Sequence, residues 1–344
     1  MTTRVAVNGL GRIGRAFLAL ALKRPEIEVV AANDLGDIEN IAYLLTYDSV
    51  YGKNENAVSV RRGNEPALVV GGRTIPFLSE RDPAKLPWGA LDVDVVVEAT
   101  GFFASYEKSR AHLTAGAKRV VVTAPVKDAP PSGISGATVL MGVNEGNLRA
   151  CDISSNASCT TNAGSPLIAI LKEAVGVEKA ILSTVHGYTA SQSVVDAPNA
   201  KNYRLGRAAA QNIIPSSTGA AIATTKAMPE LEGKFDGIAI RVPVVAGSLV
   251  DVTFVAGRPT SVEEVNGALK RAAQSDRWKG VFTVTDEPIV STDILGSAHA
   301  SIADLSMTRV VGGNLVKVLA WYDNEMGYTH TLVDHVVKSG SYLQ

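Results

Sequence analysis

The chain has 344 residues, of which 46% are hydrophobic and 19% charged, so it has ample material for a buried core and is not a disordered protein. At roughly 150 residues per domain, this length predicts about two domains. The 33 basic and 34 acidic residues nearly cancel, which argues against nucleic acid as the main partner. No apolar run reaches the 18 or so residues of a membrane span, and the N-terminus does not read as a secretory signal. Two cysteines cannot form a disulfide framework, so we expect a reducing, cytoplasmic compartment.

The first part of the chain has the order strand, glycine-rich turn, helix, strand. A β-branched run at 4–8 ends at glycines, apolar residues recur at helical spacing over 15–23, and a second apolar run spans 28–32. Further on, two Val-rich strands are predicted at 93–98 and 119–122, with a helix between them at 105–117. Continuous Val runs are typical of parallel strands buried on both faces, so these elements predict a Rossmann-type parallel sheet.

After about residue 150 the pattern changes. A helix at 163–175 and a strand at 180–185 are followed by an irregular polar stretch at 187–206. Later strands alternate between apolar and polar residues, at 237–242, 248–255 and 316–321, and a last helix is predicted over 324–339. Alternation indicates an antiparallel sheet with one exposed face.

We therefore predict an α/β protein with two domains. The first is an N-terminal Rossmann-type dinucleotide-binding domain at 1–158, and the second is a C-terminal α+β catalytic domain at 159–323. The C-terminal helix, about 324–344, is expected to pack back on the first domain.

The segment GLGRIG at 9–14 fits the pattern G-x-G-x-x-G, with Gly9, Gly11 and Gly14 as its glycines. The pattern alone is weak, but here a strand precedes it, a helix follows it, and Asp34 lies 20 residues beyond Gly14 at the end of the next strand. In a dinucleotide site the helix N-terminus faces the pyrophosphate and the carboxylate accepts from ribose hydroxyls. The alternative is a tight strand–helix turn that binds nothing.

Cys159 stands among small hydroxyl residues, directly before an apolar helix. A helix N-terminus lowers the pKa of a thiol and so favours a nucleophilic thiolate. His186 follows at the end of a predicted strand, where its imidazole would serve as base and acid. For a cysteine and a histidine without further context, the alternative of a small buried cysteine and a structural histidine is favoured. Cys151 has no such surroundings and is interpreted as inert packing.

Several arginines form a weaker signal. Arg204, Arg207 and Arg241 lie in loops or at strand ends near Thr189 and the pair Thr218-Gly219. Forked guanidinium donors and backbone N–H groups suit a phosphorylated substrate. Exposure to solvent is the more common fate of a single arginine.

Taken together, these segments resemble those of the phosphorylating glyceraldehyde-3-phosphate dehydrogenase family over nearly the full length of the chain. The matching stretches include AVNGLGRIGR, NDL, YDSVYGK, ERDP, SNASCTTN, HGYT, AKNYRLGRAAAQNIIPSSTGAA, MPELEGK, IRVP and WYDNEMGY. SNASCTTN with a downstream HGYT is far more specific than any glycine pattern, so it removes the structural interpretation of Cys159 and His186.

The resemblance implies roles position by position. Cys159 would be the nucleophile, and His186 the base and later the acid. The positions that match NAD contacts are Gly9, Gly11, Arg12, Ile13, Gly14, Asp34, Arg81, Thr123 and Asn324. Those that match sites for the substrate phosphate and inorganic phosphate are Ser158, Thr160, Thr189, Arg204, Thr218, Gly219 and Arg241. The resemblance also implies a homotetramer, in which a loop at about 187–207 helps to line a neighbour's cofactor site.

The expected reaction oxidises D-glyceraldehyde 3-phosphate with NAD and inorganic phosphate to 1,3-bisphosphoglycerate, in glycolysis or gluconeogenesis. No metal is expected, since the sequence holds no HExxH motif or paired CxxC. One alternative is a dehydrogenase of erythrose 4-phosphate, which has a similar SNASCTTN segment. Another is a non-catalytic binding scaffold, for instance on RNA.

Overall fold

The computed structural model describes residues 2–200 and 202–343, which divide into two compact units. Of the described residues, 2–139, 145–157 and 332–343 form the first unit, and 140–144, 158–200 and 202–331 form the second. Met1, Lys201 and Gln344 lie outside the described residues, so the expected loop at about 187–207 and the two chain ends are described without them. Ser158 belongs to the second unit because its side chain caps the helix that follows it.

The first unit contains a nine-stranded sheet in the order β10-β11-β9-β8-β1-β2-β7-β6-β5. Its strands are β1 (Thr3–Asn8), β2 (Ile27–Asn33), β5 (Val58–Arg61), β6 (Ala67–Val70), β7 (Arg73–Leu78), β8 (Val95–Glu98), β9 (Arg119–Val122), β10 (Gly136–Thr138) and β11 (Ile153–Ser155). Its remaining elements are α1 (Arg12–Ala21), α2 (Ile38–Thr46), α3 (Tyr106–Thr114), the 3-10 turns η1 (Pro83–Lys85) and η2 (Glu145–Ala150), and the short pair β3 (Tyr47–Asp48) and β4 (Gly52–Lys53).

The strands from β10 to β7 are parallel, and β8 and β9 are buried along their whole length. The Val-rich runs therefore form the predicted parallel sheet. The strands β5 and β6 extend it by antiparallel pairing, which the sequence pattern does not predict.

The second unit contains a seven-stranded sheet in the order β13-β14-β12-β15-β18-β17-β16. Its strands are β12 (Lys179–Gly187), β13 (Ile214–Ser217), β14 (Phe235–Val242), β15 (Ser248–Val255), β16 (Phe282–Thr285), β17 (Ser301–Val311) and β18 (Leu315–Tyr322). Its helical elements are α4 (Cys159–Val175), α5 (Ala220–Ala227), α6 (Val262–Ala273), η3 (Tyr203–Gly206), η4 (Pro229–Leu231) and η5 (Asp276–Trp278). The helix α7 (Met326–Ser341) begins in this unit, and its residues from Leu332 belong to the first.

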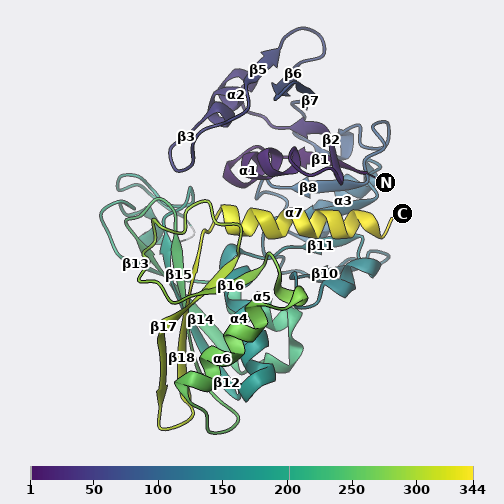
Figure 1. Ribbon diagram of the computed structural model, residues 1–344. Coiled ribbons are helices and arrows are strands. Elements are labelled where there is room, and N and C mark those ends of the chain that lie inside the picture. The colour runs from purple at the N-terminus through teal and green to yellow at the C-terminus, as the bar shows by residue number, and fades with distance from the viewer. Residues whose placement is uncertain (1, 201, 344) are drawn as a thin grey trace. The chain divides into compact units, whose positions relative to one another are not determined.

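The prediction of an antiparallel sheet in the second unit is wrong in part. The strand β12 runs parallel to β14, and β16 runs parallel to β17, so the sheet is mixed. Alternating burial reports that one face of a strand is covered and says nothing of its neighbours' direction. The alternation itself is present, because β15 and β18 bury every second residue. The helices α4 and α6 lie side by side and cover one face of this sheet (Figure 1).

Candidate active site

The glycine-rich turn between β1 and α1 has two tightly packed glycines and one open glycine. Gly9 has a φ of +98°, and a Cβ there would come within 2.7 Å of the Thr100 backbone nitrogen. A Cβ on Gly14 would lie 1.9 Å from the Gly9 carbonyl oxygen. Gly11, at the N-terminus of α1, has nothing within 4 Å of such an atom. The turn therefore packs tightly against its own unit and leaves open space where a ligand approaches a helix N-terminus.

A cavity of about 450 Å³ adjoins this turn. It is lined by Asn8, Gly9, Gly11, Asn33, Asp34, Leu35, Glu80, Arg81, Pro83, Ala99, Thr100, Phe102 and Phe103. Its size falls in the range of roughly 300–1,000 Å³ that is typical of ligand pockets. Glycines beside a helix N-terminus, a carboxylate and apolar walls are the groups that a dinucleotide needs, so these residues fit NAD.

Four of the residues expected to contact NAD line this cavity: Gly9, Gly11, Asp34 and Arg81. The Asp34 carboxylate accepts from the backbone N–H of Leu10 at 2.6 Å and from that of Gly36 at 2.8 Å, so it also fixes the glycine-rich turn.

The remaining candidates lie elsewhere. The Arg12 guanidinium is ion-paired with Asp48, and the Thr123 hydroxyl donates to the Glu98 carbonyl at 3.0 Å. Ile13 follows Arg12 in the first turn of α1. Asn324 belongs to the second unit, where its Oδ1 accepts from the backbone N–H of Gly247 and from the Ser248 hydroxyl, both at 3.0 Å.

The second unit brings Cys159 and His186 together. Cys159 is the first residue of α4, whose N-cap Ser158 accepts from the Thr161 N–H at 3.1 Å. The helix thus begins four residues before the predicted start at residue 163. His186 lies near the end of β12, with its Nε2 3.3 Å from the Cys159 Sγ. This distance permits proton transfer between thiol and imidazole.

Arg241 lies beside this pair. His186 and Arg241 are register partners on the parallel strands β12 and β14, and Arg241 Nη1 is 2.7 Å from His186 Nδ1. The Gly187 carbonyl lies 2.6 Å from Nδ1 and 3.1 Å from Nη1. When Nδ1 carries the proton it donates to this carbonyl, and Nε2 is then the acceptor that faces the thiol. When Nε2 carries the proton, it donates toward the sulfur and Arg241 donates to Nδ1.

The predicted lowering of the Cys159 pKa is wrong. Burial raises the pKa of this thiol, outweighing Arg241 and the N–H groups at the start of α4, which lower it. Burial also lowers the pKa of His186, and with the Arg241 charge brings it to about 3. Both shifts favour the uncharged forms of the two side chains.

Tyr322 supports the site and was not among the predicted residues. Its hydroxyl lies 2.9 Å from the Thr160 hydroxyl and 2.7 Å from that of Thr184, which ties the start of α4 to β12. Its ring meets that of His186 edge to face at 5.9 Å. The segment WYDNEMGY pointed to this part of the chain, but a contact between residues 162 positions apart leaves no pattern in the sequence.

The candidate phosphate-binding residues are spread over several loops. Thr218 accepts from the Ala220 N–H at 3.2 Å, and Gly219 is the exposed N-cap of α5. The Thr189 hydroxyl lies 2.9 Å from that of Ser191, and Arg204 is exposed on η3. Two members of the set contact the Cys159–His186 pair: Arg241 lies beside His186, and Thr160 hydrogen-bonds Cys159.

Cys151 has different surroundings from Cys159. Its thiol donates to the Asn147 carbonyl at 3.3 Å, and its side chain packs with Val139 and Leu148. Burial raises its pKa as well. These contacts fit the interpretation of Cys151 as packing.

Within residues 2–200 and 202–343, no group of three or more His, Cys, Asp or Glu side chains is arranged to hold a metal ion. None of the described helices is both long and apolar enough to cross a bilayer.

A dinucleotide-binding fold together with a cysteine–histidine pair is typical of an NAD-dependent aldehyde dehydrogenase. The family model described as the glyceraldehyde 3-phosphate dehydrogenase NAD binding domain matches residues 3–106, and that of the C-terminal domain matches residues 158–324. The chain belongs to the glyceraldehyde-3-phosphate dehydrogenase family.

Its relatives match it from end to end. It is 47% identical over 345 residues to glyceraldehyde-3-phosphate dehydrogenase 1 of Bacillus subtilis, covering 99% of this chain and 100% of the relative. It is 47% identical to glyceraldehyde-3-phosphate dehydrogenase 2 of Streptomyces arenae, with both chains covered in full. It is 45% identical to the glyceraldehyde-3-phosphate dehydrogenase of Haemophilus influenzae, with 99% of each covered.

Proposed function

We propose that this chain oxidises D-glyceraldehyde 3-phosphate with NAD and inorganic phosphate to 1,3-bisphosphoglycerate, the oxidative step of glycolysis and its reverse in gluconeogenesis. The observation that carries this proposal is the 3.3 Å approach of Cys159 Sγ and His186 Nε2 in a chain that matches its relatives over its whole length. The residues that line the cavity would hold NAD, with Asp34 at the ribose hydroxyls and Gly11 at the pyrophosphate.

The chain's own groups perform the first step. The Cys159 sulfur attacks the aldehyde carbon while His186 Nε2 takes the thiol proton and passes it to the carbonyl oxygen, giving a thiohemiacetal. His186 then takes the proton of the new hydroxyl as the carbon is oxidised to a thioester. The chemistry that bound NAD supplies is the acceptance of two electrons as a hydride.

Release needs phosphate rather than water. A phosphate oxygen attacks the thioester carbon, the Cys159 sulfur leaves, and His186 returns the proton to it. Arg241, beside His186, supplies positive charge for the phosphate group, and we propose that Ser158, Thr160, Thr189, Arg204, Thr218 and Gly219 complete the phosphate sites. The product keeps the oxidation energy as an acyl phosphate.

The test is NADH formation measured with glyceraldehyde 3-phosphate and with erythrose 4-phosphate, each with and without inorganic phosphate. The proposal requires fast, phosphate-dependent turnover of the three-carbon substrate. Preference for erythrose 4-phosphate would instead assign the alternative dehydrogenase. No turnover of either aldehyde would favour a binding scaffold.

We also propose that the chain works as a cytoplasmic homotetramer. Both cysteines are free thiols, as suits a reducing compartment. Large apolar side chains are exposed on the sheet face opposite α4 and α6, such as Ile181 at 63% and Ile238 at 50%. Val194 at 82% and Tyr203 at 88% are exposed on the loop after β12. Apolar surfaces of this kind are typical of subunit interfaces.

Sedimentation equilibrium tests the assembly. A mass of four chains is expected, and Ile238→Lys should shift it to a smaller species because the lysine places charge in the apolar face. The matched control is Lys226→Ala, which removes charge from α5. A wild-type protein that sediments as a monomer contradicts the tetramer.

A further inference from the structure

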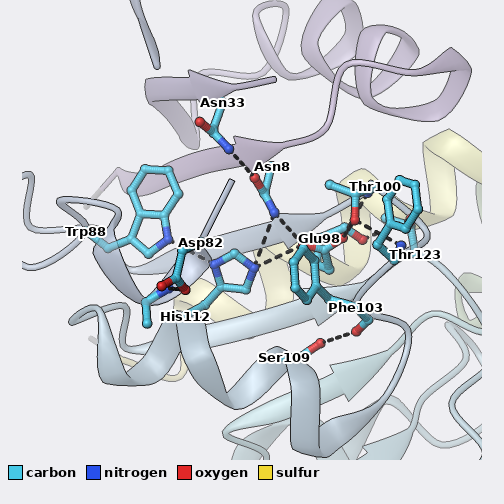
Figure 2. Close-up of polar contacts among 12 residues, drawn as sticks. Asn8, Asn33, Asp82, Trp88, Glu98, Thr100, Phe103, Ser109, His112 and Thr123 are labelled. Atoms are coloured by element: carbon cyan, nitrogen blue, oxygen red, sulfur yellow. Dashed lines mark hydrogen bonds and ion pairs between the residues drawn. The ribbon is translucent and has the colours of Figure 1, made fainter. Parts of the chain in front are cut away.

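A hydrogen-bonded series of buried polar side chains borders the NAD cavity in the first unit. It consists of Trp88, His112, Glu98, Asn8 and Asn33, each no more than 4% exposed, and is called here the Glu98 network (Figure 2). Figure 2 shows the Asn8, Glu98 and His112 side chains converging, with Trp88 and Asn33 at the two ends. A buried polar group without a partner is costly, so the direction of each hydrogen bond in this network is constrained.

One end fixes the histidine tautomer. Trp88 Nε1 is only a donor, and it lies 3.0 Å from His112 Nδ1, so that nitrogen must accept. The His112 proton is therefore on Nε2, which donates to the Glu98 carboxylate at 3.0 Å.

The other end fixes two amides. The Glu80 backbone N–H donates to Asn33 Oδ1 at 2.8 Å, so Asn33 Nδ2 must face Asn8 Oδ1, 2.7 Å away. Asn8 Nδ2 in turn donates to Glu98 at 2.6 Å. Donors from both ends of the network thus converge on one carboxylate, and neither end has a second orientation that satisfies its partners.

This carboxylate holds two walls of the NAD cavity. Its second oxygen accepts from the Thr100 N–H at 2.8 Å and from the Thr100 hydroxyl, and that hydroxyl accepts from the Phe102 N–H at 3.1 Å. Through Asn8 and Asn33, the same carboxylate also fixes the backbone of Glu80, which follows β7 in the chain. Thr100, Phe102 and Glu80 all line the cavity.

We propose that Glu98 is a positioning residue for NAD, which sets the affinity of the cavity by fixing Thr100 and Phe102 on one side and Glu80 on the other. The proposal rests on the proposed use of NAD and adds a residue that does not touch the cofactor. It predicts that changes in the network alter NAD binding and leave the chemistry at Cys159 intact.

The first test is Glu98→Gln, with the dissociation constant for NAD measured by titration. The amide has the shape of the carboxylate but turns one acceptor into a donor, and this donor must face either Thr100 or the pair Asn8 and His112. Leaving buried donors opposed in this way should weaken NAD binding by about 10-fold or more. The kcat at saturating NAD and the rate of Cys159 alkylation should stay near wild-type values.

Adding Asn8→Asp to Glu98→Gln provides a rescue. The new carboxylate accepts from the introduced amide and from Asn33, and the buried charge is conserved, while the amide still opposes the His112 Nε2–H, so the rescue is partial. The double variant should recover at least half of the lost affinity on a logarithmic scale, whereas Asn8→Asp alone places two carboxylates 2.6 Å apart and should weaken binding.

A second variant covers the case in which Glu98→Gln does not fold. Trp88→Phe removes the donor that fixes His112, at a residue that does not line the cavity, and should weaken NAD binding several-fold. Trp278→Phe in the second unit is the matched control, since it also trims a buried tryptophan and should leave the dissociation constant unchanged. A folded Glu98→Gln or Trp88→Phe protein that binds NAD as tightly as the wild type overturns the proposal. Failure of the wild-type protein to bind NAD would overturn the proposed function instead.

Discussion

Arg241 Nη1 lies 2.7 Å from Nδ1 of His186, because the parallel register of β12 and β14 places the two residues side by side. The guanidinium lowers the pKa of the imidazole, and it also lowers that of the Cys159 thiol against the effect of burial. A residue proposed to bind phosphate therefore also acts on the proton equilibrium of the catalytic pair.

Arg241→Ala should shift the alkylation of Cys159 by iodoacetamide to higher pH. The wild-type profile should already rise above the ordinary thiol range, because burial raises the pKa of Cys159, and loss of the arginine removes a charge that lowers it. The measurement is the alkylation rate from pH 6 to 10, followed by mass spectrometry. Arg207→Ala, which removes an exposed arginine paired with Asp196, is the control and should leave the profile in place. A profile that does not move in Arg241→Ala contradicts the coupling.

Cys159→Ser should abolish turnover and leave the dissociation constant for NAD within about twofold of wild type. A serine hydroxyl does not give up its proton readily enough to replace the thiol as nucleophile. Cys151→Ser is the matched control and should retain wild-type turnover, because that thiol lies against Asn147 in a packed cluster. Residual activity in Cys159→Ser, with activity lost in Cys151→Ser, would reverse the assignment of the nucleophile.

His186→Asn should slow turnover by roughly 100-fold or more, the effect of losing a positioned base. Alkylation of Cys159 near neutral pH should also slow, since no imidazole remains at 3.3 Å to take the thiol proton. The comparison variant is His299→Asn, which changes a half-buried histidine whose pKa burial also lowers. It should have wild-type rates. Equal rates in all three proteins would make His186 structural.

Two buried histidines, His186 and His335, should make the fold less stable in mild acid. Burial lowers the pKa of His335 to about 3, and its Nδ1 and Nε2 contact Asn156 and Ser154. The imidazole binds a proton near pH 6.5 in the unfolded chain but not in the folded chain. The free energy of unfolding is therefore at its full value above pH 6.5 and decreases as the pH falls toward 3.

By pH 5.5 the loss is about 1.4 kcal/mol for each such histidine. Urea unfolding at pH 7.5 and 5.5 measures it. In His335→Gln, the difference in the free energy of unfolding between pH 7.5 and pH 5.5 should be smaller by about that amount. A difference as large as in the wild type would mean that His335 is protonated in the folded state.

The sequence predicted those parts of the fold that follow from local patterns. The turn at Gly9, the buried strand β9 and the strand β15 are where the periodicity placed them. The start of α4 was placed too late because the polar residues of its first turn interrupt the apolar pattern, although Ser158 caps the helix and Cys159 is its first residue. Strand direction in the second sheet was likewise beyond a pattern that reports only burial.

The site was predictable to a similar extent. Motifs identified Cys159 and His186, and the structure brings them together. The Cys159 pKa was predicted to be lowered, on the basis of the helix N-terminus alone. Burial, which depends on the whole unit, raises it instead. The Glu98 network joins residues up to 104 positions apart, so no local signal marks it.

The cofactor preference depends on Asp34. Its carboxylate lines the NAD cavity and is held in place by the N–H groups of Leu10 and Gly36, so it cannot turn away from a ligand there. A 2′-phosphate would bring about two negative charges against it, and like charges in contact repel. Leu35 beside it is 54% exposed and offers no hydroxyl to a phosphate, and Arg12, which would offset the charge, is paired with Asp48.

We therefore expect a specificity constant at least 10-fold higher for NAD than for NADP, and Asp34→Asn should narrow this gap because it removes the charge and keeps an acceptor. Asp37→Asn, at the N-cap of α2, is the control that removes a nearby charge outside the cavity lining. Equal use of both cofactors by the wild-type protein would show that the Asp34 charge does not face the ribose.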